Sequence, residues 1–128
     1  MTIIEVMFAI VILSGVMLAM SRFGQAFTRA SRNAANLAVA SDLATARLQV
    51  VMGHATYATI VSTFNGTTET PTTSGANPPM TGHTGYTRTT SATQTVTDTT
   101  DFVTVTVQVN AAVLSKPLRK TAVIAAFR

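Results

Sequence analysis

The sequence contains no cysteine and no tryptophan, and only 11% of its 128 residues are charged. The absence of cysteine excludes disulfides and thiolate metal sites. With five carboxylates and two histidines, few groups are available as acids, bases or metal ligands. His54 and His83 have no carboxylate pattern near them in the sequence. We therefore expect neither an enzyme nor a cofactor or metal site.

Charge is also missing from most of the first twenty-four residues. From Val6 to Ser21 no residue is charged, and only Glu5 interrupts an apolar run that begins at Met1. As a helix, a run of this length covers roughly 30 Å, the hydrocarbon core of a bilayer. A cleavable signal peptide needs a basic region and a small-residue cleavage site, and the run has neither. Residues 1–24 are predicted to span a membrane or to pack against other apolar helices.

Glu5 is the one ionisable side chain in this run. A carboxylate inside an apolar span costs about 2.5–3.5 kcal/mol, so it needs a partner. The closest cation in the sequence is the amino group of Met1, on the same chain or on a staggered neighbour. At 4 Å and an effective dielectric constant near 20, such a pair attracts by roughly 4 kcal/mol. Pairing between chains would offset the desolvation cost and fix the axial stagger of two helices.

The stretch MTIIEVMFAIVILSGVMLAM resembles the mature amino terminus of type IV pilins and type II secretion pseudopilins. Their pattern is F-T-L-I-E before an apolar run, and Met1 stands in place of the phenylalanine. The resemblance implies cleavage of a basic leader by a prepilin peptidase, usually with methylation of the new terminus. It implies that Met1, Thr2 and Glu5 direct assembly. The residues implied to pack in the filament core are Ile3, Ile4, Val6, Met7, Phe8, Ile10, Val11, Leu13, Val16, Met17 and Met20.

One long helix is predicted from about Thr2 to Met52, because no proline precedes Pro71 and apolar residues recur at helical spacing. Residues 25–54 are expected to form its amphipathic half, which the head's sheet covers, and an apolar stripe runs from Phe23 to Val51. Interior glycine costs about 1 kcal/mol relative to alanine. We therefore expect a weak point that stretches or melts in the assembled state, at Ser14, Gly15 and Gly24.

The remaining residues, 55–128, are predicted to form a small head. Its expected elements are a short helix at about 57–64 (favoured over a strand), a loop at 66–85, and strands at about 86–97, 102–110 and 118–127. The middle strand alternates strictly, with four valines on one face. The loop is rich in threonine, and a plain solvated loop is favoured over an O-glycosylated one. The candidate glycosylation positions are Thr67, Thr68, Thr72 and Thr73.

Two groups of charged residues in the head are expected to have structural roles. Asp98 and Asp101 are expected to form a turn and not a calcium site, since too few oxygen ligands surround them. The basic residues are expected to form a solvated strand edge that resists unwanted pairing with other strands. This interpretation is favoured over a patch that binds nucleic acid. Nucleic-acid binding is accordingly expected to be weak or absent. The basic residues are Arg88, Lys116, Arg119, Lys120 and Arg128.

The expected fold class is α+β, a type IV pilin fold in which the long helix packs on a three-stranded antiparallel sheet. The expected function is that of a structural subunit, held in the bacterial inner membrane and then polymerised with its copies into a cell-surface filament. The expected partners are the prepilin peptidase, an assembly platform and minor pilins. Such filaments serve adhesion, motility, DNA uptake or secretion. The alternatives are a minor pilin, a pseudopilin in a periplasmic pseudopilus, and a non-polymerising membrane-anchored binding module.

Overall fold

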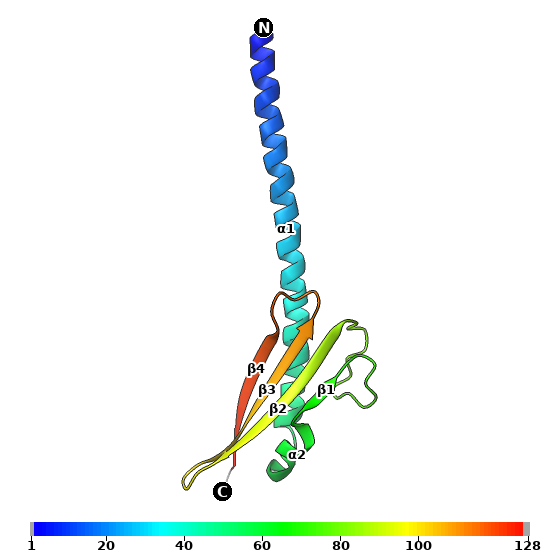
Figure 1. Ribbon diagram of the computed structural model, residues 1–128, viewed down its shortest axis with the longest axis vertical. Coiled ribbons are helices and arrows are strands. Elements are labelled where there is room, and N and C mark those ends of the chain that lie inside the picture. Colours follow the sequence, from blue (N-terminus) through cyan, green and yellow to red (C-terminus); the bar gives the residue numbers. More distant parts are fainter. Residues whose placement is uncertain (1, 127–128) are drawn as a thin grey trace. The chain divides into compact units, whose positions relative to one another are not determined.

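A computed structural model describes residues 2–126 of the chain (Figure 1). The α+β class, the long first helix and the antiparallel sheet predicted from the sequence are confirmed. The predicted roles of Met1, Phe127 and Arg128 lie outside the described residues. In chain order the elements are α1 (Ile3–Met52), a 3-10 turn (Tyr57–Thr59), α2 (Ile60–Phe64), β1 (Thr67–Glu69), β2 (Tyr86–Val96), β3 (Asp101–Ala111) and β4 (Leu118–Ala125).

The chain divides into two compact units, residues 1–35 and 36–128, and α1 contributes to both. In the first unit α1 is continuous through Ser14, Gly15 and Gly24. The Ser14 hydroxyl donates to the Ile10 carbonyl at 2.7 Å, a back-bond that slightly destabilises a helix. A Cβ added at either glycine would meet nothing within 4 Å. The predicted melting concerns an assembly, so it stays a prediction.

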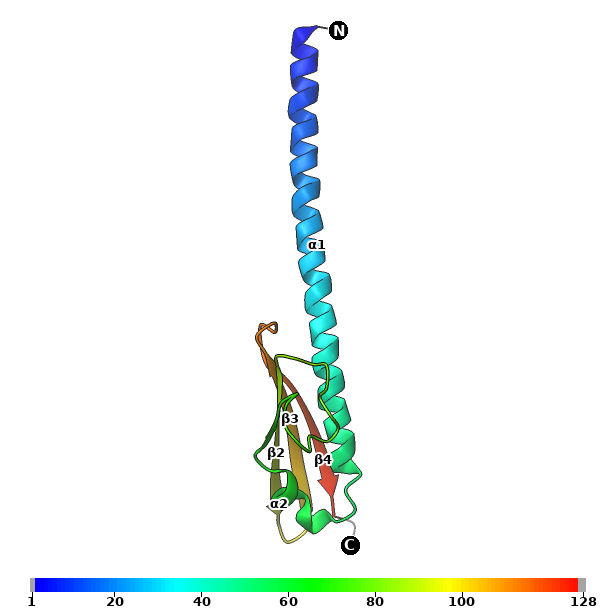
Figure 2. The same ribbon diagram turned by 90° about the vertical axis from the view of Figure 1, so that its right-hand side faces the viewer.

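The sheet in the second unit has the strand order β1-β2-β3-β4, and all its neighbours are antiparallel. Strands β2 and β3 form a hairpin of eleven residue pairs, from Tyr86 opposite Ala111 to Val96 opposite Asp101. The Thr97 amide donates to the Thr100 carbonyl at 2.7 Å, which closes the turn predicted at this point. Strand β4 pairs with the other side of β3, as Figures 1 and 2 show.

The prediction of three strands was wrong, because the sheet has four. The additional strand, β1, lies inside the predicted loop 66–85 and pairs Thr67 with Thr90 and Glu69 with Arg88. Three polar residues are too few to produce a recognisable alternation. Gly66, at φ 73°, supplies the left-handed conformation that turns the chain from α2 into β1.

The core of the second unit lies between the last part of α1 and one face of the sheet (Figure 2). On α1 the buried apolar residues follow helical spacing. On β3 every second residue is a valine exposed by 1% or less. Ile60 and Phe64 of α2 complete the cluster. The α1 and β3 residues in it are Ala40, Leu43, Ala44, Leu48, Val51, Val103, Val105, Val107 and Val109.

The apolar stripe of α1 is buried only in its last part. The predicted stripe began at Phe23, whereas the first buried residue of α1 is Ala40. Phe23 and Phe27 are 73% and 66% exposed. Helical periodicity shows that a face is apolar, but it does not show whether the same chain covers that face. The large side chains of the stripe before Ala40, which are Phe23, Phe27 and Leu37, are thus 49–73% exposed.

Candidate functional site

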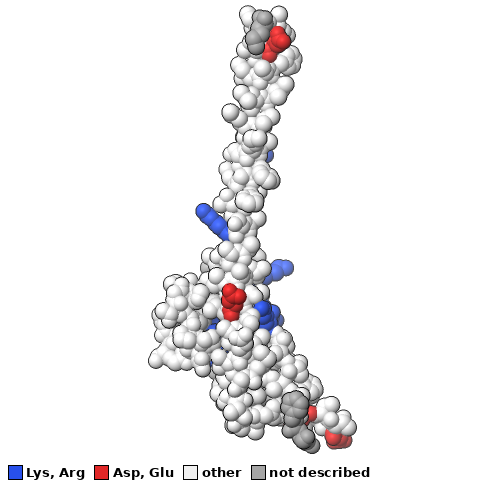
Figure 3. All heavy atoms as spheres, turned by 180° about the vertical axis from the view of Figure 1, so that it is seen from behind, with Lys and Arg blue, Asp and Glu red and all other residues white. Residues whose placement is uncertain are grey.

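The large apolar side chains of the first unit are exposed. Its large apolar side chains between Ile3 and Met20 range from 41% exposed at Val6 to 83% at Ile3. An 18-residue window of α1 reaches a mean hydropathy of 2.5, and none of it is buried. Figure 3 shows it as a long, mostly uncharged stretch. By length and composition the helix can cross a membrane, a property that a signal sequence shares.

This exposure is a large energetic liability in water. Phe8 and Met17, two of the large filament-core candidates, are 63% and 64% exposed. Burying one large apolar side chain contributes about 1.5–3 kcal/mol, and more than ten of them lie on this helix. The total is on the order of tens of kcal/mol. Transfer of the segment into a bilayer, or packing against other apolar helices, would remove this cost.

The lone carboxylate of this segment lies in the first turn of α1 and is exposed. The Thr2 backbone amide donates to Glu5 Oε2 at 3.4 Å, as in the second half of a capping box. A carboxylate at this position also interacts favourably with the helix dipole. Within residues 2–126 Glu5 forms no ion pair. Its second oxygen is free to meet a cation that another molecule supplies.

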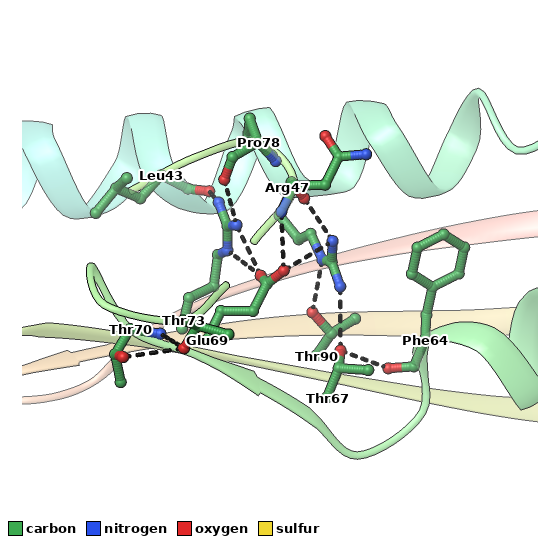
Figure 4. A network of polar contacts seen from close by, with 11 residues as sticks. Leu43, Arg47, Phe64, Thr67, Glu69, Thr70, Thr73, Pro78 and Thr90 are labelled. Carbon is green, nitrogen blue, oxygen red and sulfur yellow. Dashed lines mark hydrogen bonds and ion pairs between the residues drawn. The ribbon is translucent and has the colours of Figure 1, made fainter. Parts of the chain in front are cut away.

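A second polar feature, which the sequence reasoning missed, lies inside the head (Figure 4). Arg47 of α1, Glu69 of β1 and Arg88 of β2 are 4%, 6% and 0% exposed. Arg88 donates through Nε to Glu69 Oε2 at 2.8 Å, and its terminal nitrogen lies 2.7 Å from the same oxygen. Arg47 lies 3.2 Å from Glu69 Oε1. We call these three residues the buried ionic cluster.

Both arginines of the buried ionic cluster also donate to backbone carbonyls. Arg88 donates to Leu43 O at 3.2 Å and to Pro78 O at 2.8 Å. Arg47 donates to the carbonyl of Asn77, and the Asn77 amide donates to Glu69 Oε1 at 3.1 Å. The cluster thereby ties α1, β1, β2 and the 70–85 loop together. Its groups hold one another and the backbone, so it is a structural site.

Hydroxyls and one aromatic ring complete the surroundings of Arg47. Its Nε donates to Thr90 Oγ1 at 3.2 Å and its terminal nitrogen to Thr67 Oγ1 at 3.1 Å. The guanidinium lies 5.1 Å from the centroid of the Phe64 ring, within the range of a cation–π contact. Burial lowers the pKa of the Arg47 guanidinium, the Glu69 carboxylate opposes this shift, and Arg88 reinforces it. No buried side-chain nitrogen or oxygen lacks a partner within residues 2–126.

The predicted basic surface cluster was wrong for Arg88, which is fully buried. Lys116 and Arg119 are exposed, and Arg119 donates to Gln108 Oε1 across the two strands at 2.8 Å. Lys120 is half-buried and donates to Thr45 Oγ1 of α1 at 2.7 Å. Arg119 and Lys120 thus contact their own sheet and helix.

The threonines proposed for glycosylation differ in their surroundings. The Thr67 hydroxyl donates to Phe64 O at 2.9 Å and accepts from Arg47, so it is already occupied. The Thr68 hydroxyl faces that of Thr89 at 3.3 Å. Thr72 and Thr73 are exposed, although their hydroxyls bond to Thr70. Of the four, Thr68, Thr72 and Thr73 are exposed and Thr67 is half-buried.

Neither histidine lies in a cluster that could bind a metal. His54 Nε2 lies 2.9 Å from Thr59 Oγ1, and its ring meets Phe64 edge-on at 5.1 Å. The His83 ring meets Tyr86 edge-on at 6.4 Å. Over residues 2–126, no three histidine, aspartate or glutamate side chains are grouped as metal ligands. Asp98 and Asp101 flank the β2–β3 hairpin turn.

The Tyr57 phenol forms a short hydrogen bond at the end of the sheet. It donates to Asp101 Oδ1 at 2.6 Å, and Gln94 Nε2 donates to the same oxygen at 2.9 Å. Partial burial and the adjacent Asp101 carboxylate raise the pKa of Tyr57 above its ordinary value. The folded state therefore retains this proton longer than the unfolded chain does. The stability from this contact is complete below pH 10 and is lost as the pH rises through the pKa of the folded state.

We expect the Tyr57 phenol to titrate above pH 10 because of these contacts. The chain has two tyrosines, so in a Tyr86→Phe background the absorbance of phenolate near 295 nm reports on Tyr57 alone. Adding Asp101→Asn should move the midpoint down, since it removes the negative acceptor. A midpoint at or below pH 10 before that second substitution would contradict the assigned hydrogen bond.

No family model, no curated protein and no solved structure matches this chain. The fold itself, a long first helix followed by a small antiparallel sheet, is compatible with that of a pilin. The function must therefore be inferred from features of this chain itself. They are an uncovered apolar helix with one carboxylate in its first turn, and a head with its own core.

Proposed function

We propose that this chain is a structural subunit of a type IV pilus-like filament. Its first helix would hold it in the inner membrane of a bacterium before assembly and would form the core of the filament afterwards. The observation that carries the proposal is the apolar segment around Phe8, which the chain leaves uncovered although it bears the carboxylate of Glu5. The sequence resemblance over residues 1–20 points in the same direction.

Two physical terms would act together during assembly. Burial of the apolar side chains against neighbouring helices supplies cohesion, but this attraction has no direction and fixes no register. An ion pair between Glu5 and the amino group of Met1 on a neighbouring subunit would supply the register. Such a pair repays the desolvation of its charges only if its geometry is good. Misaligned subunits would thus bury an unpaired charge and be rejected.

A plain membrane anchor explains the apolar residues but gives no reason for Glu5. In an anchor the carboxylate costs free energy, and a neutral residue at that position would insert better. The capping contact with the Thr2 amide at 3.4 Å is worth about 1 kcal/mol, less than the insertion cost. This imbalance favours a polymerising subunit over a non-polymerising binding module.

The head would face outward from such a filament. Its core and its buried ionic cluster lie entirely within residues 36–128, so its internal contacts do not depend on what covers the apolar segment. The same head can serve before and after assembly. A minor pilin or a pseudopilin would use the same device and differ in the destination of the polymer.

Filaments sheared from the surface of the source cells are expected to contain this chain. Electron microscopy should show thin filaments, and mass spectrometry of the sheared fraction should identify the chain with an amino-terminal peptide that begins at Met1. Cells that lack the prepilin peptidase are the control, and should retain an uncut precursor in the membrane. A chain found solely in the membrane fraction, as a monomer, in cells with an intact peptidase would overturn the proposal.

A further inference from the structure

Three arginines follow the apolar segment on one face of α1. Arg22, Arg29 and Arg32 are exposed, and at about 100° per residue their positions fall within an arc of roughly 80°. Nothing neutralises them locally, because the sequence has no carboxylate between Glu5 and Asp42. We call this surface the arginine face.

Polar groups fill the space between these arginines. A shallow hollow on the helix includes Gly24, which has no side chain and so leaves room above the backbone. The other residues around it supply hydroxyl, amide and guanidinium groups, and none is acidic. The opposite face of the same turns is apolar, with Phe23 and Phe27. The residues that line the hollow are Ser21, Gly24, Gln25, Thr28, Arg29 and Arg32.

Two of these arginines, Arg22 and Arg29, are close enough to the apolar segment to reach a lipid head-group layer. Arg22 directly follows the segment, and Arg29 and Arg32 lie about 12 and 16 Å beyond Ser21 at 1.5 Å per residue. The head-group layer on each side of a bilayer is roughly 5–8 Å thick. Helical side chains lean toward the amino terminus, so these arginines lean back toward the bilayer. Arg22 then lies in the head-group layer, and Arg29 reaches its outer edge.

We propose that the arginine face binds the phosphates of anionic phospholipid head groups while the apolar segment is in a bilayer. A guanidinium suits this role, because its planar fork donates two parallel hydrogen bonds to a phosphate. An anionic phospholipid is the expected ligand because its charge is opposite to that of the arginines and because the arginine face continues directly from the apolar segment. The inference rests on the membrane-held state of the proposed function, but not on polymerisation. Each arginine near the surface should favour an anionic over a neutral lipid by about fivefold.

The test is lipid retention by the full-length chain. The chain is reconstituted in vesicles of three parts phosphatidylglycerol to seven parts phosphatidylcholine, released with a neutral detergent, and analysed for the lipids it retains. Wild-type chain is expected to enrich phosphatidylglycerol, and R22Q/R29Q should lower the enrichment by up to roughly 25-fold, about fivefold for each arginine. The matched control K116Q/R119Q removes the same charge from exposed positions on the head and should change it by less than twofold.

Two outcomes would overturn the inference. The first is equal enrichment by wild type and R22Q/R29Q; if this variant also loses filaments, the arginine face is a contact between copies. In the second, added inorganic phosphate releases the bound lipid more than chloride does at equal ionic strength, which would indicate a site for free phosphate. Flotation with phosphatidylcholine vesicles tests separately whether the chain enters a bilayer at all, because a chain that does not insert will not float with the vesicles.

Discussion

The Glu5→Gln substitution is expected to abolish filaments while the subunit still accumulates in the membrane. Glutamine keeps the size of the side chain and removes the charge, so membrane insertion becomes easier by up to about 2.5–3.5 kcal/mol. The attraction of roughly 4 kcal/mol to a neighbouring amine disappears, which corresponds to a loss of several hundredfold in each subunit contact. Sheared filaments and membrane-bound chain are quantified by immunoblot of the two fractions.

Asp42→Asn is the matched control for this experiment. Asp42 is the other carboxylate of α1, is exposed, and takes part in no ion pair within residues 2–126. Its neutralisation should leave both the sheared and the membrane fractions close to wild type. Filaments of normal abundance from Glu5→Gln would eliminate the proposed role of Glu5. Loss of the variant from the membrane as well would show that Glu5 acts in insertion or stability.

The Glu69→Gln substitution is expected to destabilise the head by about 3–5 kcal/mol. It leaves the two buried guanidinium groups of Arg47 and Arg88 without their shared counter-charge, and removal of one partner from a buried pair costs this much. A soluble domain of this size has a total stability of 5–15 kcal/mol, so a large part of it would be lost. With a urea m-value of about 1.5 kcal/mol/M, the unfolding midpoint should fall by roughly 2–3 M.

Stability is measured by urea unfolding of the full-length chain in a neutral detergent. In a separate experiment without urea, limited proteolysis reports how fast the 70–85 loop is cleaved. Asp98→Asn, an exposed carboxylate in the hairpin turn, is the control and should change stability by less than about 0.5 kcal/mol. Wild-type stability of Glu69→Gln would contradict the structural role of the buried ionic cluster. Faster cleavage of the loop in this variant is also expected, since Glu69 holds in place the two arginines that donate to the carbonyls of Asn77 and Pro78.

The long helix and the central strand of the sheet could be predicted because their signals are long. An apolar run without proline fixes α1, and the alternation of valine with threonine fixes β3. Strand β1 could not be predicted, since three polar residues between turns carry no period. Its place in the sheet depends on pairing with β2, a long-range contact that local sequence does not encode.

The buried ionic cluster did leave a signal in the sequence. Arg47 occupies a position of the buried helical stripe, with Ala40, Leu43, Ala44, Leu48 and Val51 at helical spacing around it. Arg88 shares its strand face with Tyr86, Thr90 and Ala92, which are also buried. The positions of Arg47 and Arg88 in the helix and strand patterns thus indicated that they are buried, whereas arginine as a residue type is usually exposed. The partner Glu69 could not be inferred, because it lies in a segment read as a loop.

The most direct test of the central claim is a helical reconstruction of filaments that contain this chain. We predict that neighbouring helices cover the apolar side chains around Phe8, and that the Glu5 carboxylate lies within about 4 Å of an amino group from an adjacent subunit. A reconstruction in which Glu5 faces water, or one in which the apolar segments make no contact with each other, would contradict the account.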